Sequence, residues 1–359
     1  MTFEEARAAF PVLERVAFLN AGSVGPIARA TVQAMAVQEQ ADLEQGRGGM
    51  AYIRGMLDSR DRVRAQIAAL IGAEAQNVAL AYSTSNACNI VLAGLDLGPE
   101  DEVVTTDVEH FGLLGPLHAS GARVRVAAVR DLPAEQALDA ILAEVRPRTR
   151  LLALSHVAWT TGNFLPVAEL KARTGLPILV DGAQSVGAIP VDVGDFDFYS
   201  VSGQKWLCGP DATGALYVAD PERLRVALPS YVSQSSYEPD GDFVPREGAE
   251  RFDSGGIPLP SLAGLVAAIQ AAPEWRYDRA HETTARCRAL LAERYEVITA
   301  PDHATLVTFR PGGDAAATAA ALYERGVLVR HLPRTDWLRA SIGYWTSDED
   351  LERLLDALD

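Results

Sequence analysis

The stretch RLLALSHVAWTTGNFLPVAELKARTGLPILVDGAQ, residues 150–184, decides the fold class. It holds two short apolar runs, 150–157 and 176–184, that have the composition of buried strands. Between them, residues 167–175 have the spacing of an amphipathic helix that ends at a glycine. A strand, a helix and a second strand in this order predict two parallel strands joined by a crossover helix.

The same alternation continues on both sides of this stretch, so we expect an α/β fold with a mostly parallel sheet covered by helices. The other expected strands lie at 77–82, 101–107, 123–129 and 196–202. The other expected helices lie at 85–95, 113–122 and 133–145. In such sheets ligands bind beyond the carboxyl ends of the strands. Polar residues that follow an apolar run are therefore the candidates for a site.

The last third of the chain changes character, with a long charged helical stretch followed by short strand-like and helical runs. We expect a large domain at 16–268, and a smaller α+β domain formed by 269–359 together with 1–15. The polar stretch 231–258 is rich in turn-forming residues and predicts a long loop, a kind of segment that is often functional.

Composition excludes several classes of function. The net charge is −16 over 359 residues, which argues against a nucleic-acid surface because phosphate neutralisation needs clustered Lys and Arg. No apolar run approaches membrane-spanning length, and the first residues are acidic, unlike a secretory signal, so we expect a cytoplasmic enzyme. Cys88, Cys208 and Cys287 are scattered and odd in number, which favours free thiols over disulfides or a zinc site.

Lys205, in SVSGQKWLCGP at 200–210, is one of only two lysines in the chain. The other, Lys171, lies in a polar helical stretch and is expected at the surface. Lys205 instead follows a strand and precedes an apolar pair. A lysine amine can lose its proton and condense with an aldehyde, whereas a guanidinium stays protonated. The spacing leaves open two roles for Lys205, a covalent or catalytic amine and a structural ion pair.

Asp181 ends an apolar strand and Gln184 follows three residues later. A carboxylate at this place can act as a base or as the partner of a cationic ring nitrogen, and it can also cap a helix. A metal site is disfavoured because neither a histidine nor a second aspartate lies nearby in the sequence.

Three further features have both a functional and a plain structural interpretation. Ser83, Thr84 and Ser85 stand at a strand-to-helix transition, where hydroxyls cap helices and free backbone N–H groups bind phosphate. His110 follows a strand end and is either a satisfied polar group or a ring that stacks on an aromatic ligand. Arg339, in an apolar run, is either an ion-pair partner or the bidentate receptor of a substrate carboxylate.

Taken together, these residues resemble the aminotransferase class V family of pyridoxal phosphate (PLP) enzymes, which includes cysteine desulfurases, cystine C–S lyases and isopenicillin N epimerase-like proteins. The most specific motifs are DGAQSVG and SGQKWLCGPDATGALYV, and the resemblance runs from FLNAGSVGP to WLRASIGYWTSDEDLERLL. It implies the PLP-dependent transferase fold type I, with a mostly parallel seven-stranded sheet, and a homodimer whose active site lies near the subunit interface.

The resemblance also implies roles for single residues. Lys205 would bind the cofactor aldehyde covalently and act as the catalytic base, Asp181 would hold the ring nitrogen protonated, and Gln184 would contact the phenolic oxygen. His110 would stack on the ring and take part in catalysis. The expected phosphate ligands are Thr84, Ser85, Ser202 and Gln204, and the expected substrate contacts are Arg339, Asn20, Trp159 and Thr160.

Three positions depart from the usual family pattern. Gln204 stands where relatives have a histidine before the lysine, and Trp159 with Thr160 where many have an asparagine. Gly256 stands where many have a threonine that reaches the phosphate of the partner subunit; its backbone N–H could replace that hydroxyl.

A fourth departure bears on the reaction. Cysteine desulfurases carry a persulfide-forming cysteine on a loop ahead of the carboxylate-binding arginine, and the corresponding stretch 329–337 has none. We therefore expect a C–S lyase that converts a cysteine- or cystine-type amino acid to pyruvate and ammonia. An aminotransferase, an epimerase, a desulfurase-like activity without a loop cysteine, and a non-catalytic binding protein on the same fold are the alternatives. Arg330 and His331 lie near the expected substrate entrance and either tune substrate choice or are ordinary surface residues.

Overall fold

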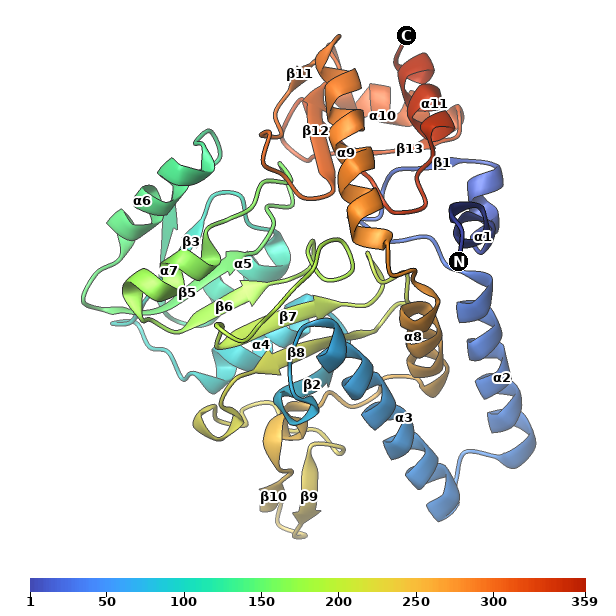
Figure 1. Ribbon diagram of the computed structural model, residues 1–359. Helices are drawn as coiled ribbons and strands as arrows, with labels where there is room; N and C mark the ends of the chain where they lie inside the picture. The colour runs from blue at the N-terminus through green and yellow to red at the C-terminus, as the bar shows by residue number, and fades with distance from the viewer.

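The computed structural model describes the backbone of residues 1–359 and all side chains except those at 134 and 135. Its centre is a seven-stranded sheet in the order β2-β8-β7-β6-β5-β3-β4 (Figure 1). Neighbouring strands are parallel except around β8, which runs antiparallel to β2 and β7. The strands are β2 (Val78–Ala81), β3 (Glu102–Thr106), β4 (Arg123–Ala127), β5 (Thr149–Ser155), β6 (Ile178–Asp181), β7 (Phe198–Ser202) and β8 (Gly214–Val218). This confirms the expected mostly parallel sheet; β8 is a strand that the sequence did not predict.

Two helical layers cover the sheet because its strands are apolar on both faces. Alternate residues of one strand enter different cores: Leu80 packs in the same core as Ile67 and Leu265, whereas Ala79 packs with Val91 and Leu117. One face is covered by α3 (Gly49–Leu70), α6 (Ala134–Glu144), α7 (Val167–Thr174) and α8 (Leu259–Ala271). The other is covered by α4 (Thr84–Gly94) and α5 (Phe111–Ala119).

A second, four-stranded sheet in the order β11-β12-β15-β14 lies at one end of the molecule (Figure 1). Its elements are β11 (Glu296–Val297), β12 (Leu306–Arg310), β14 (Arg330–His331), β15 (Leu338–Ser341), α9 (Arg276–Ala292), α10 (Ala315–Glu324) and α11 (Asp348–Leu358). The N-terminal segment joins this part: β1 (Ala17–Phe18) pairs in parallel with β13 (Val327–Leu328). The first helix, α1 (Phe3–Ala8), is tied to it by an ion pair between Arg7 and Asp350 of 2.6 Å. The domain boundaries proposed from the sequence stay a prediction.

The polar stretch 231–258, expected as a loop, contains a short antiparallel hairpin of β9 (Gln234–Tyr237) and β10 (Phe243–Pro245), which protrudes beyond β2 (Figure 1). The remaining long helix, α2 (Arg29–Gln45), packs beside α8 and leads to α3. Among the residues with described placement, no helix is both long and apolar enough to cross a bilayer.

Candidate active site

The candidate residues gather where β3, β5, β6 and β7 end. His110 follows β3, Trp159 follows β5, Asp181 ends β6, and Lys205 follows β7. These strands are parallel neighbours, so their carboxyl ends meet at one edge of the sheet. Arg339, on β15 of the second sheet, closes the site from the opposite side.

Lys205 lies under the N-terminal segment. The backbone N–H of Gly25 donates to the carbonyl oxygen of Gln204 at 2.8 Å, and a Cβ on Gly25 would lie 2.1 Å from the carbonyl oxygen of Lys205. Burial lowers the pKa of Lys205 to about 8, the nearby charge of Asp181 opposes that shift, and Arg339 supports it. In the part of the chain that the structure describes, the Lys205 amine has no hydrogen-bond partner. With its pKa lowered to about 8, this amine loses its proton at a lower pH than an ordinary lysine.

Asp181 is 3% exposed, and only one of its two oxygens is engaged. Its Oδ1 accepts from the backbone N–H of Ala183 and from the hydroxyl of Ser200, each at 3.0 Å. No described donor is bonded to Oδ2, which leaves that oxygen for a cationic group of a ligand.

Gln184 is held in one orientation. The indole N–H of Trp206 donates to its Oε1 at 3.0 Å, and its Nε2 donates to the carbonyl oxygen of Gly22 at 2.9 Å. Since the indole nitrogen can only donate, the amide oxygen must face Trp206. One amide hydrogen of Gln184 is left to donate to a ligand.

His110 caps α5 through its ring. Its Nδ1 accepts from the backbone N–H of Gly112 at 3.0 Å, which places the proton of a neutral ring on Nε2. The ring stands edge-to-face against Trp159, with centroids 5.0 Å apart and an interplanar angle of 86°. Burial, and then the positive charge of Lys205, lower the pKa of His110.

Two arginines share the substrate side of the site. Arg330 on β14 and Arg339 on β15 stand directly opposite each other in the sheet register. Their Cζ atoms lie 5.8 and 5.9 Å from the centroid of the Trp159 ring. Arg339, 1% exposed, donates to the carbonyl oxygen of Trp159 at 2.7 Å; burial and the charge of Arg330 lower its pKa to about 9. Among the described residues, no carboxylate forms an ion pair with either arginine.

Asn20 reaches this place through Ser23, a residue that the sequence analysis missed. The Ser23 hydroxyl donates to Asn20 Oδ1 at 2.8 Å and accepts from Arg330 at 2.9 Å and from Arg339 at 3.5 Å. Ser23 lies in a segment of small residues between β1 and α2, and nothing in that local sequence indicates a contact with the two arginines.

Thr160 and the expected phosphate ligands lie around this centre. The carbonyl oxygen of Thr160 accepts from the Thr308 hydroxyl at 2.6 Å, while the Thr160 hydroxyl is buried without a described partner.

The expected phosphate ligands lie at the start of α4 and after β7. Thr84 and Ser85 are the first residues of α4, whose cap is Ser83. The Ser202 hydroxyl donates to Gln204 Oε1 at 2.9 Å. Ser85 Oγ lies beside Gly112, near His110, since a Cβ on Gly112 would be 2.7 Å from it.

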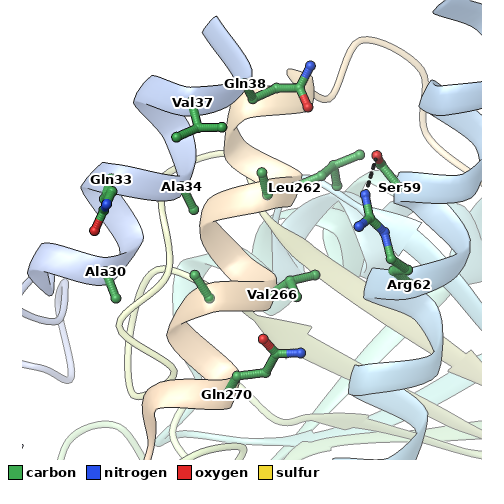
Figure 2. A pocket seen from close by; sticks show the side chains of 12 residues that line it. Ala30, Gln33, Ala34, Val37, Gln38, Ser59, Arg62, Leu262, Val266 and Gln270 are labelled. Carbon is green, nitrogen blue, oxygen red and sulfur yellow. Dashed lines mark hydrogen bonds between the residues drawn. The ribbon is translucent and has the colours of Figure 1, made fainter. Parts of the chain in front are cut away.

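Among the described residues, no contact places Gly256 at this centre. It has a φ of 74° and lines a separate cavity of about 950 Å³, together with Arg47, Tyr52 and Arg60. A further groove between α2, α3 and α8 is lined by residues such as Ala34 and Val266 and contains none of the expected site residues (Figure 2).

Glu109, beside His110, is a second residue that sequence reasoning missed. Its Oε1 accepts from the Thr106 hydroxyl at 2.6 Å and its Oε2 from the backbone N–H of Ser155 at 2.9 Å, so it joins the ends of β3 and β5. Burial raises its pKa to about 7. Only the position of Glu109 next to His110 could have drawn attention to it.

Several buried polar atoms around Arg339 have no partner in the described chain: Arg339 Nε, Ser341 Oγ, Trp159 Nε1 and Thr160 Oγ1. Such atoms are rare in folded proteins unless a ligand or water satisfies them.

The groups at the strand ends fit PLP. They offer an unpaired amine on Lys205, a free carboxylate oxygen on Asp181 and a free amide hydrogen on Gln184.

Comparisons with known proteins agree with this chemistry. The sequence model of the family Aminotransferase class-V matches residues 30–354. Isopenicillin N epimerase of Streptomyces clavuligerus is 32% identical over 402 residues, covering 99% of this chain and 98% of that protein. A cysteine desulfurase of Haloferax volcanii is 32% identical over 347 residues, covering 84% and 78%.

Solved structures match over nearly the whole chain. A complex of the cystine C–S lyase C-DES with its product cysteine persulfide has a TM-score of 0.89 and 28% identity, covering 97% of this chain and 98% of that one. A mutant of C-DES with glycine covalently linked to the PLP cofactor has a TM-score of 0.90 and 27% identity, with 98% of both chains covered. This chain is therefore a PLP-dependent enzyme that belongs to the aminotransferase class V family.

Proposed function

We propose that this enzyme is a C–S lyase acting on cystine or on a similar amino acid that carries a second anionic group. The observation that carries the proposal is the pair Arg330 and Arg339, both directed at Trp159 and neither paired with a carboxylate among the described residues. An α-amino acid brings one carboxylate, which one arginine satisfies. A second carboxylate, as in cystine, would satisfy the other.

The cofactor would be held by the residues that end the strands. Lys205 would bind it covalently, Asp181 Oδ2 would face the ring nitrogen, the free amide hydrogen of Gln184 would reach the phenolic oxygen, and the start of α4 would hold the phosphate. When bound, PLP supplies an electron sink for the substrate carbanion.

The chain's own residues then handle substrate and proton. Arg339, fixed by the carbonyl oxygen of Trp159, orients the α-carboxylate, and Arg330 receives the distal anionic group. The Lys205 amine, with a pKa of about 8, takes the proton from Cα. Loss of the sulfur group from Cβ and hydrolysis of the remaining fragment give pyruvate, ammonia and a thiol or persulfide.

The cysteines argue against a desulfurase that passes sulfur through a protein persulfide. Cys88, Cys208 and Cys287 are all buried, and burial raises the pKa of each thiol. None lies in 329–337, the stretch that precedes Arg339.

An epimerase is the second candidate, favoured by the 32% identity to isopenicillin N epimerase over 99% of this chain. It would use the same amine and the same arginines, and it would differ only in returning a proton to Cα.

One experiment separates these activities. The purified holoenzyme is incubated with L-cystine, L-cysteine and a panel of amino acids, and pyruvate, other keto acids and D-isomers are measured. We expect pyruvate from cystine without an amino acceptor. Keto acid that forms only with an acceptor would replace the lyase by an aminotransferase, and D-isomer without pyruvate would replace it by an epimerase.

We also propose a cytoplasmic homodimer. Exposed apolar side chains on α2 and α3, including Val37, Leu43 and Met50, support a subunit contact there. Light scattering of the purified protein tests the homodimer, and a monomer at working concentration would contradict it.

A further inference from the structure

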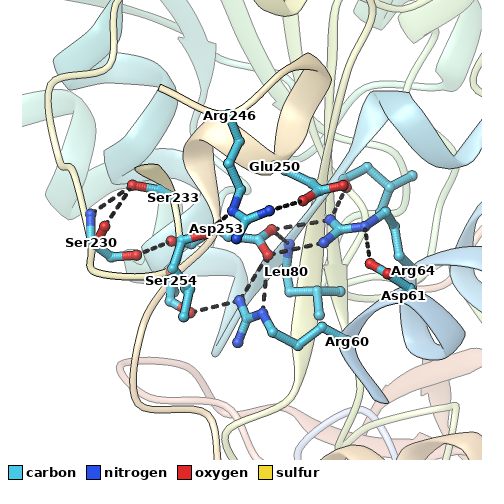
Figure 3. Close-up of polar contacts among 12 residues, drawn as sticks. Arg60, Asp61, Arg64, Leu80, Ser230, Ser233, Arg246, Glu250, Asp253 and Ser254 are labelled. Carbon is cyan, nitrogen blue, oxygen red and sulfur yellow. Dashed lines mark hydrogen bonds and ion pairs between the residues drawn. The ribbon is translucent and has the colours of Figure 1, made fainter. Parts of the chain in front are cut away.

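We propose that Ser254, held in place by Asp253, is a positioning residue for the cofactor phosphate. The proposal rests on the proposed function, in which the start of α4 receives that phosphate. Its basis is a buried polar network around Asp253, at the β2 edge of the seven-stranded sheet (Figure 3).

Asp253 is an anchor with every oxygen engaged. Its Oδ2 accepts from Arg60 at 2.9 Å and from Arg64 at 3.0 Å, and its Oδ1 accepts from Arg64 at 3.1 Å (Figure 3). Asp253 and both arginines are under 5% exposed. A carboxylate that is buried between two guanidinium groups is fixed in position because leaving either partner unpaired is costly.

This anchor binds the free edge of the sheet. β2 is an edge strand, so its outward backbone groups need partners. The N–H of Leu80 donates to Asp253 Oδ1 at 2.7 Å, and the carbonyl oxygen of Leu80 accepts from the N–H of Ser254 at 2.8 Å. Asp253 and Ser254 thus satisfy the backbone N–H and the carbonyl oxygen of Leu80, on the strand that precedes α4.

Ser254 then reaches the helix itself. Its hydroxyl donates to Asn86 Oδ1 at 2.6 Å, and the backbone N–H of Asn86 donates to the hydroxyl of Ser83, the cap of α4. Thr84 and Ser85 lie between the two fixed points, Leu80 and Asn86. The network therefore sets where these hydroxyls and the free N–H groups of the first helical turn stand.

The control residue lies in the same loop. Ser233, fully buried, bonds through its hydroxyl to the backbone N–H and carbonyl oxygen of Ser230 at 2.8 and 2.9 Å. Ser230 in turn donates its hydroxyl to the backbone carbonyl oxygen of Asp253 at 2.6 Å, so Ser233 supports the same loop, but it has no described contact with α4 (Figure 3). Ser233→Ala thus removes a buried hydroxyl without touching the start of the helix.

The test compares PLP with pyridoxal, which lacks the phosphate. Apoprotein, prepared by removing the cofactor with hydroxylamine, is titrated with each compound while tryptophan fluorescence is followed. We expect Ser254→Ala to weaken PLP binding by about fivefold, the effect of one hydrogen bond, and to leave pyridoxal binding unchanged. Ser233→Ala should change neither. Ser254→Thr keeps the hydroxyl and should restore PLP binding.

Other outcomes have separate meanings. Equal weakening of PLP and pyridoxal by Ser254→Ala, or no change in either, would overturn the positioning role. Wild-type protein that binds neither compound would instead overturn the proposed function, and wild-type protein that binds both equally would remove the phosphate site. If Ser254→Ala does not fold, Asn86→Ala, which removes the acceptor, is judged by the same PLP-to-pyridoxal comparison.

Discussion

Arg330 and Arg339 face each other directly across β14 and β15, two like charges in opposed register positions. Such a pair destabilises a sheet unless something compensates it. Both side chains are directed at Trp159, and both donate to the hydroxyl of Ser23. The chain thus keeps an unfavourable arrangement at the place where a substrate with two anionic groups would bind.

Arg330→Gln should separate the two arginines. We expect kcat/KM for cystine to fall about 10- to 100-fold, the effect of a lost charge-assisted hydrogen bond. The value for S-methylcysteine, which has one carboxylate, should change little, whereas Arg339→Gln should lower both. Arg334→Gln, an exposed residue in the adjoining turn, is the control. An equal fall of kcat/KM for both substrates in Arg330→Gln would show that Arg330 does not bind the second anionic group.

The same variant should stabilise the apoprotein. Removing one of two opposed like charges raises the free energy of unfolding by roughly 0.2–1 kcal/mol. Thermal denaturation of wild-type and Arg330→Gln apoprotein, with and without cystine, checks this. The variant should have the higher melting temperature when cystine is absent. A lower melting temperature in Arg330→Gln apoprotein would contradict the repulsion.

Capture of PLP by the apoprotein should depend on pH through Lys205. Only the neutral amine attacks an aldehyde, and the pKa of Lys205 is lowered to about 8. The rate of capture should rise with pH up to about 8 and then level off, well below the usual lysine value of 10.5. Stopped-flow absorbance measures it. Lys205→Ala should show no covalent capture at any pH, and a rate that keeps rising to pH 10 would contradict the lowered pKa.

Gly22 has room for hydrogen only. A Cβ there would lie 2.8 Å from the guanidinium of Arg339, 2.9 Å from Ser341 Oγ and 3.0 Å from Gln184 Oε1. Gly22→Ala should displace these groups and lower kcat/KM by about 10- to 100-fold, because small misplacements of binding groups are costly. Gly98→Ala, whose Cβ would meet nothing nearer than 3.9 Å, is the matched control and should leave activity unchanged.

Glu109 should make stability depend on pH. Its pKa is raised from 4.5 to about 7, so between these values the folded protein holds a proton that the unfolded chain has released. Stability is therefore lost as pH rises from about 4.5 to 7. Glu109→Gln has no titrating proton at this position. As pH rises from about 4.5 to 7, its free energy of unfolding should therefore rise relative to that of wild type, by on the order of 1–3 kcal/mol. Urea denaturation at several pH values measures it, and parallel curves for the two proteins would contradict the raised pKa.

Most of the sheet could be predicted from the sequence because its strands are short, apolar and bounded by turn residues. The expected strand at 150–157 appears as Thr149–Ser155, and that at 196–202 as Phe198–Ser202. β8 was missed because Gly214–Val218 begins with a glycine and forms the end of the motif that was assigned to the site. The hairpin β9–β10 was missed because β9 is mostly polar and exposed and β10 is only three residues long, so neither shows the alternation that marks a half-buried strand.

The sequence alone determined the fold class and the strand ends at which Asp181 and Lys205 stand, because local hydrophobic periodicity marks both. It also singled out Lys205, one of only two lysines in the chain, since a lysine amine has chemistry that a guanidinium cannot provide. Only the tertiary structure decided the rest. Arg330 and Arg339 are opposed through sheet register, Ser23 joins them from more than three hundred residues away in the chain, and Asp253 binds an edge strand that no local pattern connects to it. These relationships depend on which segments pack side by side, and that is set by the burial of the whole chain.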